Sequence, residues 1–282
     1  MPRRAIVTFA SRKYRHSQKR FLNQARNIRA FDDYFIWSET DLADTFREEF
    51  AGLLSEEVRG FGYWVWKPQV ILQAFEHLDW GDLLLYLDSG SHIVESGEER
   101  LRDYFSICSS HPSGVLAFQM SLVEHDWTKS DLFEFFGVKK SREITETGQI
   151  QAGAIFFRKT PSSVEMVNEW LAVFRSNESL VNDHPSESRN ATTFREHRHD
   201  QSVFSVLGKI RGIALLSAAE QFPEPPLTWD DLGRYPIHHR RDKQKNIGLK
   251  RALRNLRKRG MPLEVFAVRA KARIVRLCQG GR

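Results

Sequence analysis

Short apolar segments that alternate with segments of helical spacing constrain the fold of this chain more than any other feature. The predicted strands cover residues 5–10, 34–37, 82–87, 115–120, 151–158 and 212–217. The helices predicted between them cover residues 17–29, 41–54, 68–78, 100–108, 129–136, 162–174 and 200–207. Such alternation predicts a mixed, mainly parallel α/β sheet with helices on both faces. Ligands of such sheets bind outside the carboxyl ends of the strands, so polar residues that follow strands are the candidates for function.

The length and composition suit one large domain. The chain has 282 residues, 41% of them hydrophobic, which is enough for a sizeable core. Its two cysteines, Cys108 and Cys278, make neither a disulfide framework nor a zinc-ligand spacing. Gly-rich phosphate loops and the Gly-x-Ser-x-Gly of serine hydrolases are absent. Without a signal peptide or a long apolar segment, the sequence predicts a cytoplasmic protein.

The net charge of +6 is unevenly distributed along the chain. Residues 243–282 contain 13 Lys and Arg and a single acid, Glu264, so the rest of the chain is net acidic. We therefore predict a main domain over 1–242 and a basic tail over 243–282 made of two amphipathic helices. The tail fits an anionic membrane surface, a nucleic acid or a solvated hairpin that packs on the domain, and the acidic main domain argues against a nucleic-acid partner.

Asp88 is the strongest single signal, because it follows directly on the apolar run that ends at Leu87. A carboxylate at the end of a buried strand is costly unless it binds something. A divalent cation that holds a diphosphate is a good candidate, since Mg²⁺ and Mn²⁺ prefer oxygen ligands. The alternative is a turn, for which Asp88-Ser89-Gly90 is a common composition.

Four motifs in a fixed order suggest a family. They are Gly60-Phe61-Gly62-Tyr63-Trp64-Val65-Trp66-Lys67-Pro68, Tyr86-Leu87-Asp88-Ser89-Gly90, Gln149-Ile150-Gln151-Ala152-Gly153 and Glu196-His197-Arg198-His199-Asp200-Gln201-Ser202. The series resembles bacterial GT-A glycosyltransferases, many tied to surface polysaccharide synthesis, and its order is similar to the retaining galactosyltransferase and glycogenin group. The resemblance spans residues 5–241. It implies a Rossmann-like GT-A fold and a metal-assisted hexosyltransferase, with retention of configuration favoured.

The resemblance also implies roles for individual residues. Asp88 would bind Mn²⁺ or Mg²⁺, and either His238 or His239 would be the second metal ligand, although paired histidines in a basic loop equally suit a solvated surface. Asp200 and Gln201 would be catalytic, with Asp200 near the sugar hydroxyls and Gln201 against the anomeric carbon. As an alternative, Asp200 is an N-cap.

The remaining candidates would bind the nucleotide-sugar donor. They are Thr8, Ser11, Trp66, Lys67, Asp88, Gln151 and Gly153. Aromatic faces stack on bases and sugars, and a lysine meets phosphate. The open alternatives are core packing for the aromatic residues, a helix cap for Thr8 and Ser11, and a β-bulge at Gly153.

Two positions depart from the family pattern and leave a second function open. Gly90 stands where the family has the second Asp of Asp-x-Asp, and Gln151 stands where it has Asn. The alternative is therefore a degenerate GT-A fold that binds a nucleotide or glycan without catalysis. For the enzyme, the implied partners are a nucleotide-sugar donor and a glycan or lipid-linked acceptor. Because lipid-linked acceptors are built at membranes, we favour the membrane surface for the tail, and we expect no nucleic acid.

Overall fold

The computed structural model describes residues 2–240, and a six-stranded sheet is at the centre of this part of the chain. The sheet has the order β2-β1-β3-β6-β5-β7, with bounds β1 (Arg4–Phe9), β2 (Asp33–Trp37), β3 (Leu83–Leu87), β5 (Val115–Val123), β6 (Gly148–Arg158) and β7 (Ala214–Ser217). β6 is antiparallel to both neighbours, and the other pairings are parallel. The prediction of a mixed, mainly parallel α/β sheet is confirmed.

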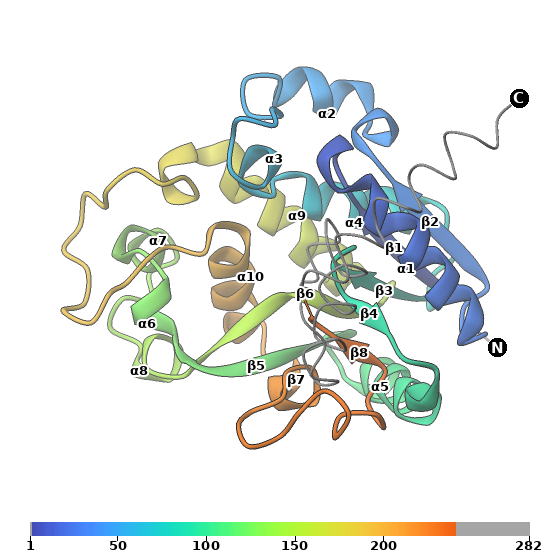
Figure 1. The fold of residues 1–282 in the computed structure, drawn as a ribbon. Helices are drawn as coiled ribbons and strands as arrows, with labels where there is room; N and C mark the ends of the chain where they lie inside the picture. Colours follow the sequence, from blue (N-terminus) through green and yellow to red (C-terminus); the bar gives the residue numbers. More distant parts are fainter. Residues whose placement is uncertain (1, 241–282) are drawn as a thin grey trace, which may run out of the picture. The chain divides into compact units, whose positions relative to one another are not determined.

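Helices cover both faces of the sheet (Figure 1). One hydrophobic core contains residues of α4 (Trp66–Glu76), α9 (Pro161–Ser176) and α10 (His199–Ile210). The second core contains residues of α1 (Arg15–Asn27) and α5 (Glu98–Ser110). In Figure 1, α9 and α10 lie above β5 and β6, and α5 lies below them.

β3 shows why the sequence folds this way. All five of its residues are buried, and they alternate between the two cores, with Leu84 and Tyr86 in one and Leu83, Leu85 and Leu87 in the other. A strand covered on both faces needs an unbroken apolar run, and residues 83–87 supply it. Asp88 is the first residue beyond that run, at the carboxyl edge of the sheet.

Shorter elements complete the described part of the chain. The helices are α2 (Asp44–Glu49), α3 (Gly60–Tyr63), α6 (Glu124–Trp127), α7 (Ser130–Phe135), α8 (Arg142–Thr145) and the 3₁₀ turns η1 (Arg12–Tyr14), η2 (Glu39–Asp41), η3 (Glu95–Gly97), η4 (Glu178–Leu180) and η5 (Ala218–Glu220). The helix predicted over 41–54 is shorter, because Ser38 and Asp41 cap η2 reciprocally and the chain turns after Glu49. A two-stranded antiparallel sheet of β4 (His92–Ile93) and β8 (Ile237–His238) was not predicted.

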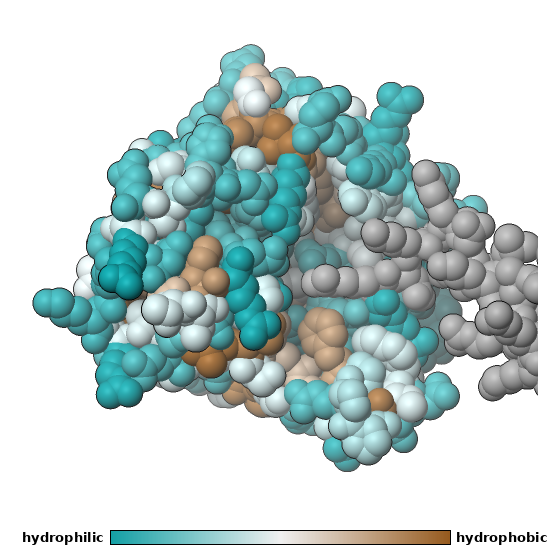
Figure 2. Space-filling model, turned by 60° about the vertical axis from the view of Figure 1, so that its left-hand side comes forward, coloured by the Kyte–Doolittle hydropathy of each residue, from teal (hydrophilic) through white to brown (hydrophobic). Residues whose placement is uncertain are grey.

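The surface of the described part gives little sign of one broad apolar contact area on the side drawn in Figure 2. That side is mainly hydrophilic, and its hydrophobic residues gather in separate patches. Within residues 2–240, none of the helices has both the length and the apolar character needed to span a bilayer. The predicted basic tail, residues 243–282, lies outside the described residues, so the tail and the domain boundary before it stay predictions.

Candidate active site

Asp88 is held at the end of β3 by the chain on both sides of it. Its backbone N–H donates to the carbonyl of Gly153 at 2.9 Å, which extends the pairing of β3 with β6. Its Oδ1 accepts a hydrogen bond from the hydroxyl of Tyr86 at 2.7 Å. Burial, followed by the neighbouring Asp88, raises the pKa of Tyr86 well above its usual value, so this hydroxyl stays protonated. The side chain of Asp88 is 41% exposed and therefore accessible to a ligand.

Lys67 links Asp88 to Asp200 inside the protein. Its ammonium lies 2.5 Å from Oδ2 of Asp200 and 3.6 Å from Oδ1 of Asp88, and it donates to the carbonyl of Ala152 at 3.1 Å. Burial on its own lowers the pKa of a lysine, but the two carboxylates outweigh it, so the pKa of Lys67 is raised and the side chain is a fixed cation. Three acceptors lie around its three N–H groups, so the hydrogen-bonding groups of Lys67 already have partners within the protein.

Asp200 lies in the first turn of α10 and is almost fully buried. Burial raises its pKa to about 6, although Lys67 acts in the opposite direction. The N-cap position of α10 belongs to Arg198 and not to Asp200, whose carboxylate is the partner of Lys67. A buried carboxylate with a raised pKa next to a fixed cation makes this position a candidate functional site.

Gly153 lies in an irregular part of β6 and beside Asp88 at the same time. Leu116 of β5 pairs with Phe156, whereas Phe118 pairs with Gln151, so residues 152–155 of β6 lie opposite a single residue of β5. Bulges of this kind redirect side chains and are common next to active sites. A Cβ on Gly153 would lie 3.0 Å from Cε1 of His239 and 3.1 Å from Oδ2 of Asp88. The glycine therefore lets these two side chains face the same point.

The structure distinguishes His238 from His239, because successive residues of an extended segment point in opposite directions. The side chain of His238 is buried, with Nε2 2.9 Å from the carbonyl of Leu232. His239 instead faces Asp88 across Gly153. Its Nδ1 lies 2.7 Å from the hydroxyl of Ser91, and its Nε2 lies 2.9 Å from Oε1 of Gln221.

Gln151 and Gln201 approach the same region from β6 and α10. The side-chain amide of Gln151 donates to Oε1 of Gln221, the same oxygen that contacts His239. Gln201 accepts a hydrogen bond from the backbone N–H of Ala152 at 3.4 Å and donates to Oε1 of Gln149 at 2.7 Å. Both glutamines thus lie beside the segment of β6 that carries Gly153.

Three further candidates lie around the end of β1. Thr8 is buried in β1, and its hydroxyl has no hydrogen-bond partner among the described residues. Ser11 is buried just before η1 and makes no capping hydrogen bond. Trp66 stacks on Phe9 with ring centroids 4.1 Å apart, so the core-packing alternative describes its position. Among the described residues, no hydrogen bond or ion pair joins these three side chains to Asp88.

The aromatic motif before α4 forms a left-handed turn. The five residues 60–64 all have φ between +50° and +94°. Three of them, Phe61, Tyr63 and Trp64, are not glycines. Each such residue costs about 1–2 kcal/mol in this conformation. The rings of Tyr63 and Trp64 lie 5.2 and 5.5 Å from that of His199, whose own φ is +50°. Strain of this kind persists where the surroundings fix it, often at functional sites, and here it lies one residue from Asp200.

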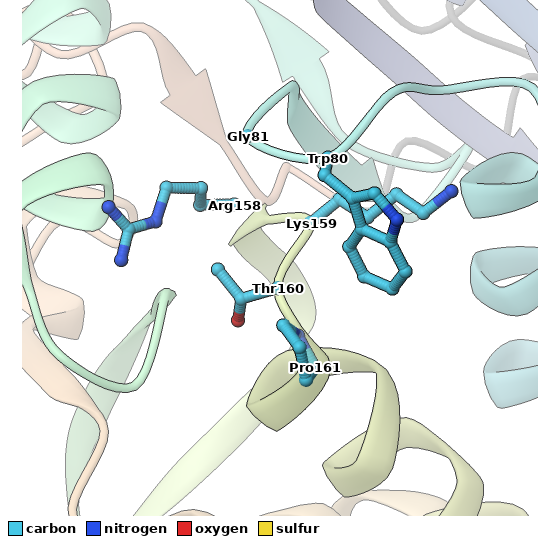
Figure 3. Close-up of a pocket in the computed structure, with 6 residues that line it drawn as sticks. All are labelled: Trp80, Gly81, Arg158, Lys159, Thr160 and Pro161. Carbon is cyan, nitrogen blue, oxygen red and sulfur yellow. The ribbon is translucent and has the colours of Figure 1, made fainter.

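A separate pocket lies at the opposite edge of the sheet, before β3 begins and after β6 ends (Figure 3). Its lining residues are Trp80, Gly81, Arg158, Lys159, Thr160 and Pro161. Trp80 is 65% exposed, and the ammonium of Lys159 lies over its ring at 4.8 Å while donating to two carbonyls at the end of α4. This pocket contains none of the predicted site residues.

The residues around Gly153 partly fit a divalent cation. One carboxylate, phosphate oxygens and water suit Mg²⁺ or Mn²⁺, and an imidazole suits Mn²⁺. Asp88 Oδ2 and His239 face one point, but both ring nitrogens of His239 have polar neighbours, so binding a metal would replace one of these contacts. Residues 2–240 contain no group of three or more His, Cys, Asp or Glu that could hold a metal ion. A cation at this point would therefore need most of its ligands from water or from a bound ligand.

The structure thus brings most of the predicted residues together. Asp88, Gln151, Gly153, Asp200, Gln201, Lys67 and His239 share one region, whereas His238 faces away from it. Sequence reasoning missed Tyr86 and Gln221, which hold Asp88 and His239. Tyr86 lies within the quoted strand motif, so its place two residues before Asp88 was visible. No sequence signal marks Gln221.

Solved structures at low sequence identity match this chain over most of its length. No protein-family model matches it, and no curated protein matches its sequence. A glycosyltransferase involved in glycosylation of the major capsid of PBCV-1 covers 85% of this chain and 93% of its own, at 13% identity and a TM-score of 0.44. The match to mouse xyloside xylosyltransferase 1 covers 85% of this chain and 97% of the mouse chain, at 10% identity and a TM-score of 0.44. The match to the galactosyltransferase LgtC, in complex with donor and acceptor sugar analogues, covers 83% of this chain and 86% of the LgtC chain. Its sequence identity is 13% and its TM-score is 0.40.

Proposed function

We propose that this protein is a glycosyltransferase that moves a sugar, of the hexose class, from a nucleoside-diphosphate donor to a glycan or lipid-linked acceptor. The observation that carries the proposal is the meeting of Asp88, Lys67 and Asp200 at the carboxyl edge of the sheet. An exposed carboxylate, a buried cation and a second carboxylate with a raised pKa form a polarised site where α/β sheets bind ligands.

Asp88 and His239 are the residues that would hold a divalent cation. When bound, Mn²⁺ or Mg²⁺ would neutralise the charge that develops on the departing nucleoside diphosphate. Asp88 supplies an oxygen ligand whose direction is fixed by Tyr86, and Gly153 leaves the space in which both side chains can reach the same ion. We propose His239 and not His238 for this role, because His238 is buried against Leu232.

Asp200 and Gln201 would act on the donor sugar. Asp200 accepts hydrogen bonds from sugar hydroxyls when it is ionised, and Lys67 keeps it in place. Gln201 lies next to Ala152 and presents its amide to the positive charge that grows at the anomeric carbon. The order of the motifs favours retention of configuration. We keep Thr8, which is in β1 and has an unpaired hydroxyl, and Ser11, which follows β1, as proposed contacts of the nucleoside.

The first experiment is a transfer and hydrolysis assay with a panel of nucleotide sugars, with and without Mn²⁺. We expect turnover with at least one donor, and Asp88→Ala should abolish it while leaving the fold intact. The matched control is Asp79→Ala, since Asp79 is an exposed carboxylate at the other end of β3. Full activity in Asp88→Ala, with the control unaffected, would refute the proposal.

A non-catalytic protein that binds a nucleotide or glycan is the second candidate. Gly90 favours it, because the second carboxylate of the family pattern is missing there and nothing lies within 4 Å of the position a Cβ would take. The same donor panel separates the two, since saturable donor binding without any turnover across the panel would favour the second candidate.

A further inference from the structure

Glu124 is a buried carboxylate for which the proposed reaction has no role. It belongs to α6 and its exposed fraction is 0%. Its Oε1 accepts hydrogen bonds from Thr128 at 2.7 Å and from Gln149 Nε2 at 3.1 Å. Its Oε2 lies 2.7 Å from the ammonium of Lys209 and also accepts from the hydroxyl of Ser205. Four donors around two oxygens are what an ionised carboxylate, which only accepts, requires.

This carboxylate, with the carbonyl of Trp127, determines which way the side-chain amide of Gln149 is turned. Because Glu124 only accepts, the NH₂ group of Gln149 must face it, and the oxygen of Gln149 must face away. That oxygen accepts from Nε2 of Gln201 at 2.7 Å. The NH₂ group of Gln201 is therefore turned towards Gln149, which leaves the oxygen of Gln201 on the other side.

The oxygen of Gln201 points to the part of β6 that borders the candidate site. It accepts from the backbone N–H of Ala152 at 3.4 Å, and the carbonyl of the same Ala152 accepts from Lys67 at 3.1 Å. Asp200, the residue before Gln201, pairs with the same Lys67. The end of this hydrogen-bonded series therefore lies beside the two charged groups of the site.

We infer that Glu124, through Gln149, fixes the amide of Gln201 so that its oxygen, and not its NH₂ group, faces the donor sugar. Glu124 and Gln149 are thus positioning residues, and the inference rests on the proposed function. A carbonyl oxygen favours the positive charge that develops at the anomeric carbon, whereas an NH₂ group in its place disfavours that charge. The side chains of Glu124 and Gln149 are fully buried, so water does not compensate there for a wrong orientation.

The test uses Glu124→Gln in the full chain. Because the ammonium of Lys209 only donates, the new amide keeps its oxygen there and turns its NH₂ group towards Thr128 and Gln149. The hydroxyl of Thr128 can accept from it, whereas the NH₂ group of Gln149 cannot, and this conflict is relieved when Gln149 and then Gln201 turn over. We expect kcat to fall about 10²-fold, as for a small misplacement of a reacting group, with the donor KM within twofold. Gln149→Leu should give the same loss, and the double variant should be no slower than either single one.

Ser205→Ala is the matched control, because it removes one hydrogen bond from the same carboxylate, and one from the backbone N–H of Ile150, without changing which way Gln149 is turned. Its kcat should stay within twofold of the wild type. If Ser205→Ala loses as much kcat as Glu124→Gln, the network stabilises the fold only and the inference is wrong. Should Glu124→Gln not fold, Gln149→Leu and Ser205→Ala make the same comparison.

A spectroscopic measurement tests the inference without turnover. With ¹⁵N-labelled glutamine, the side-chain signal of Gln201 is the one that disappears in Gln201→Leu. We expect its NH₂ hydrogens to be near those of Gln149 in the wild type, and we expect this proximity to be lost in Glu124→Gln. An unchanged signal would overturn the inference. Because donor turnover is not needed, this result is independent of whether the proposed function holds.

Discussion

The charge on Asp200 depends on its burial and on a single neighbouring cation. Lys67 lies 2.5 Å away and lowers the pKa of Asp200, whereas burial raises it, and the result is a pKa of about 6. If transfer requires ionised Asp200, kcat/KM should rise as the pH increases through about 6, because the free enzyme loses the proton there. The pH profile of kcat/KM with a fixed donor measures this.

Lys67→Met tests whether the rise in kcat/KM with pH is due to Asp200. Removing the cation leaves burial and Asp88, which both raise the pKa of Asp200, against the backbone N–H of Gln201, which lowers it less. The rise in kcat/KM should therefore move to higher pH, while Asp200→Asn should remove the rise altogether. If the rise in kcat/KM of Lys67→Met stays near pH 6, the rise is due to a group other than Asp200.

Gly153 offers a test of whether Asp88 and His239 act on one ligand. In Gly153→Ala, the new Cβ would lie about 3 Å from both side chains and would force them apart. We expect Mn²⁺-dependent donor affinity to fall by about tenfold or more, as when the supporting residues of a metal site are changed. Calorimetric titration of donor with Mn²⁺ measures it.

Gly90→Ala is the matched control for this change, since Gly90 lies in the loop directly after Asp88 and nothing approaches its Cβ position within 4 Å. Donor affinity in the control should be within twofold of the wild type. Equal losses in the two variants would mean that the loop as a whole matters and not the space between Asp88 and His239.

At the scale of elements, the left-handed turn at 60–64 is the feature that the sequence conceals most. Glycines at 60 and 62 suggest unusual backbone conformations, but nothing local predicts that Phe61, Tyr63 and Trp64 share them. The conformation is fixed by distant partners, since the ring of Trp64 covers Gly60 and also contacts His199. Local propensities are overridden by such packing, so this turn could not be derived from sequence.

Gly60→Ala should destabilise the fold by about 2 kcal/mol or more. The substitution adds a side chain at a φ of +64° and places its Cβ 2.4 Å from the ring of Trp64. Gly52→Ala is the control, because its Cβ position is open, and its free energy of unfolding should change by less than about 1 kcal/mol. Urea titrations followed by circular dichroism measure both, and similar stability in the two variants would contradict this account.

At the scale of the whole molecule, donor binding should raise the thermal stability of the native state. At a donor concentration of about 100 Kd the gain is about 2.7 kcal/mol, or roughly 5–10 °C in Tm for a chain of this size. The shift should require Mn²⁺ or Mg²⁺ and should vanish in Asp88→Ala. A thermal-shift screen over nucleotide sugars measures this change in Tm. An equal shift without the cation would contradict the proposed role of the metal in donor binding.

The sequence predicted the sheet well and the site only in part, for a physical reason. The position of Asp88 after an apolar run is a local signal, so both β3 and its terminal carboxylate could be predicted. The choice between His238 and His239 depends on the pairing of β8 with β4, which joins residues far apart in the chain. The contact of Lys67 with Asp200 likewise depends on how α4 and α10 cover the sheet, and no spacing reveals it.

The antiparallel direction of β6 determines where the chain tolerates changes in length. This strand begins at the edge that carries Asp88 and leaves at the edge that carries Trp80, so Gln151 and Gly153 belong to its first half. One residue inserted between 151 and 153 would shift the residues before it relative to the pairs with β3, exchange their two faces and turn Gln151 away from Gln221. An insertion after Arg158 would lengthen the connection to α9 and would leave the edge that carries Asp88 unaltered. We therefore expect differences in length after Arg158 rather than between Gln151 and Gly153.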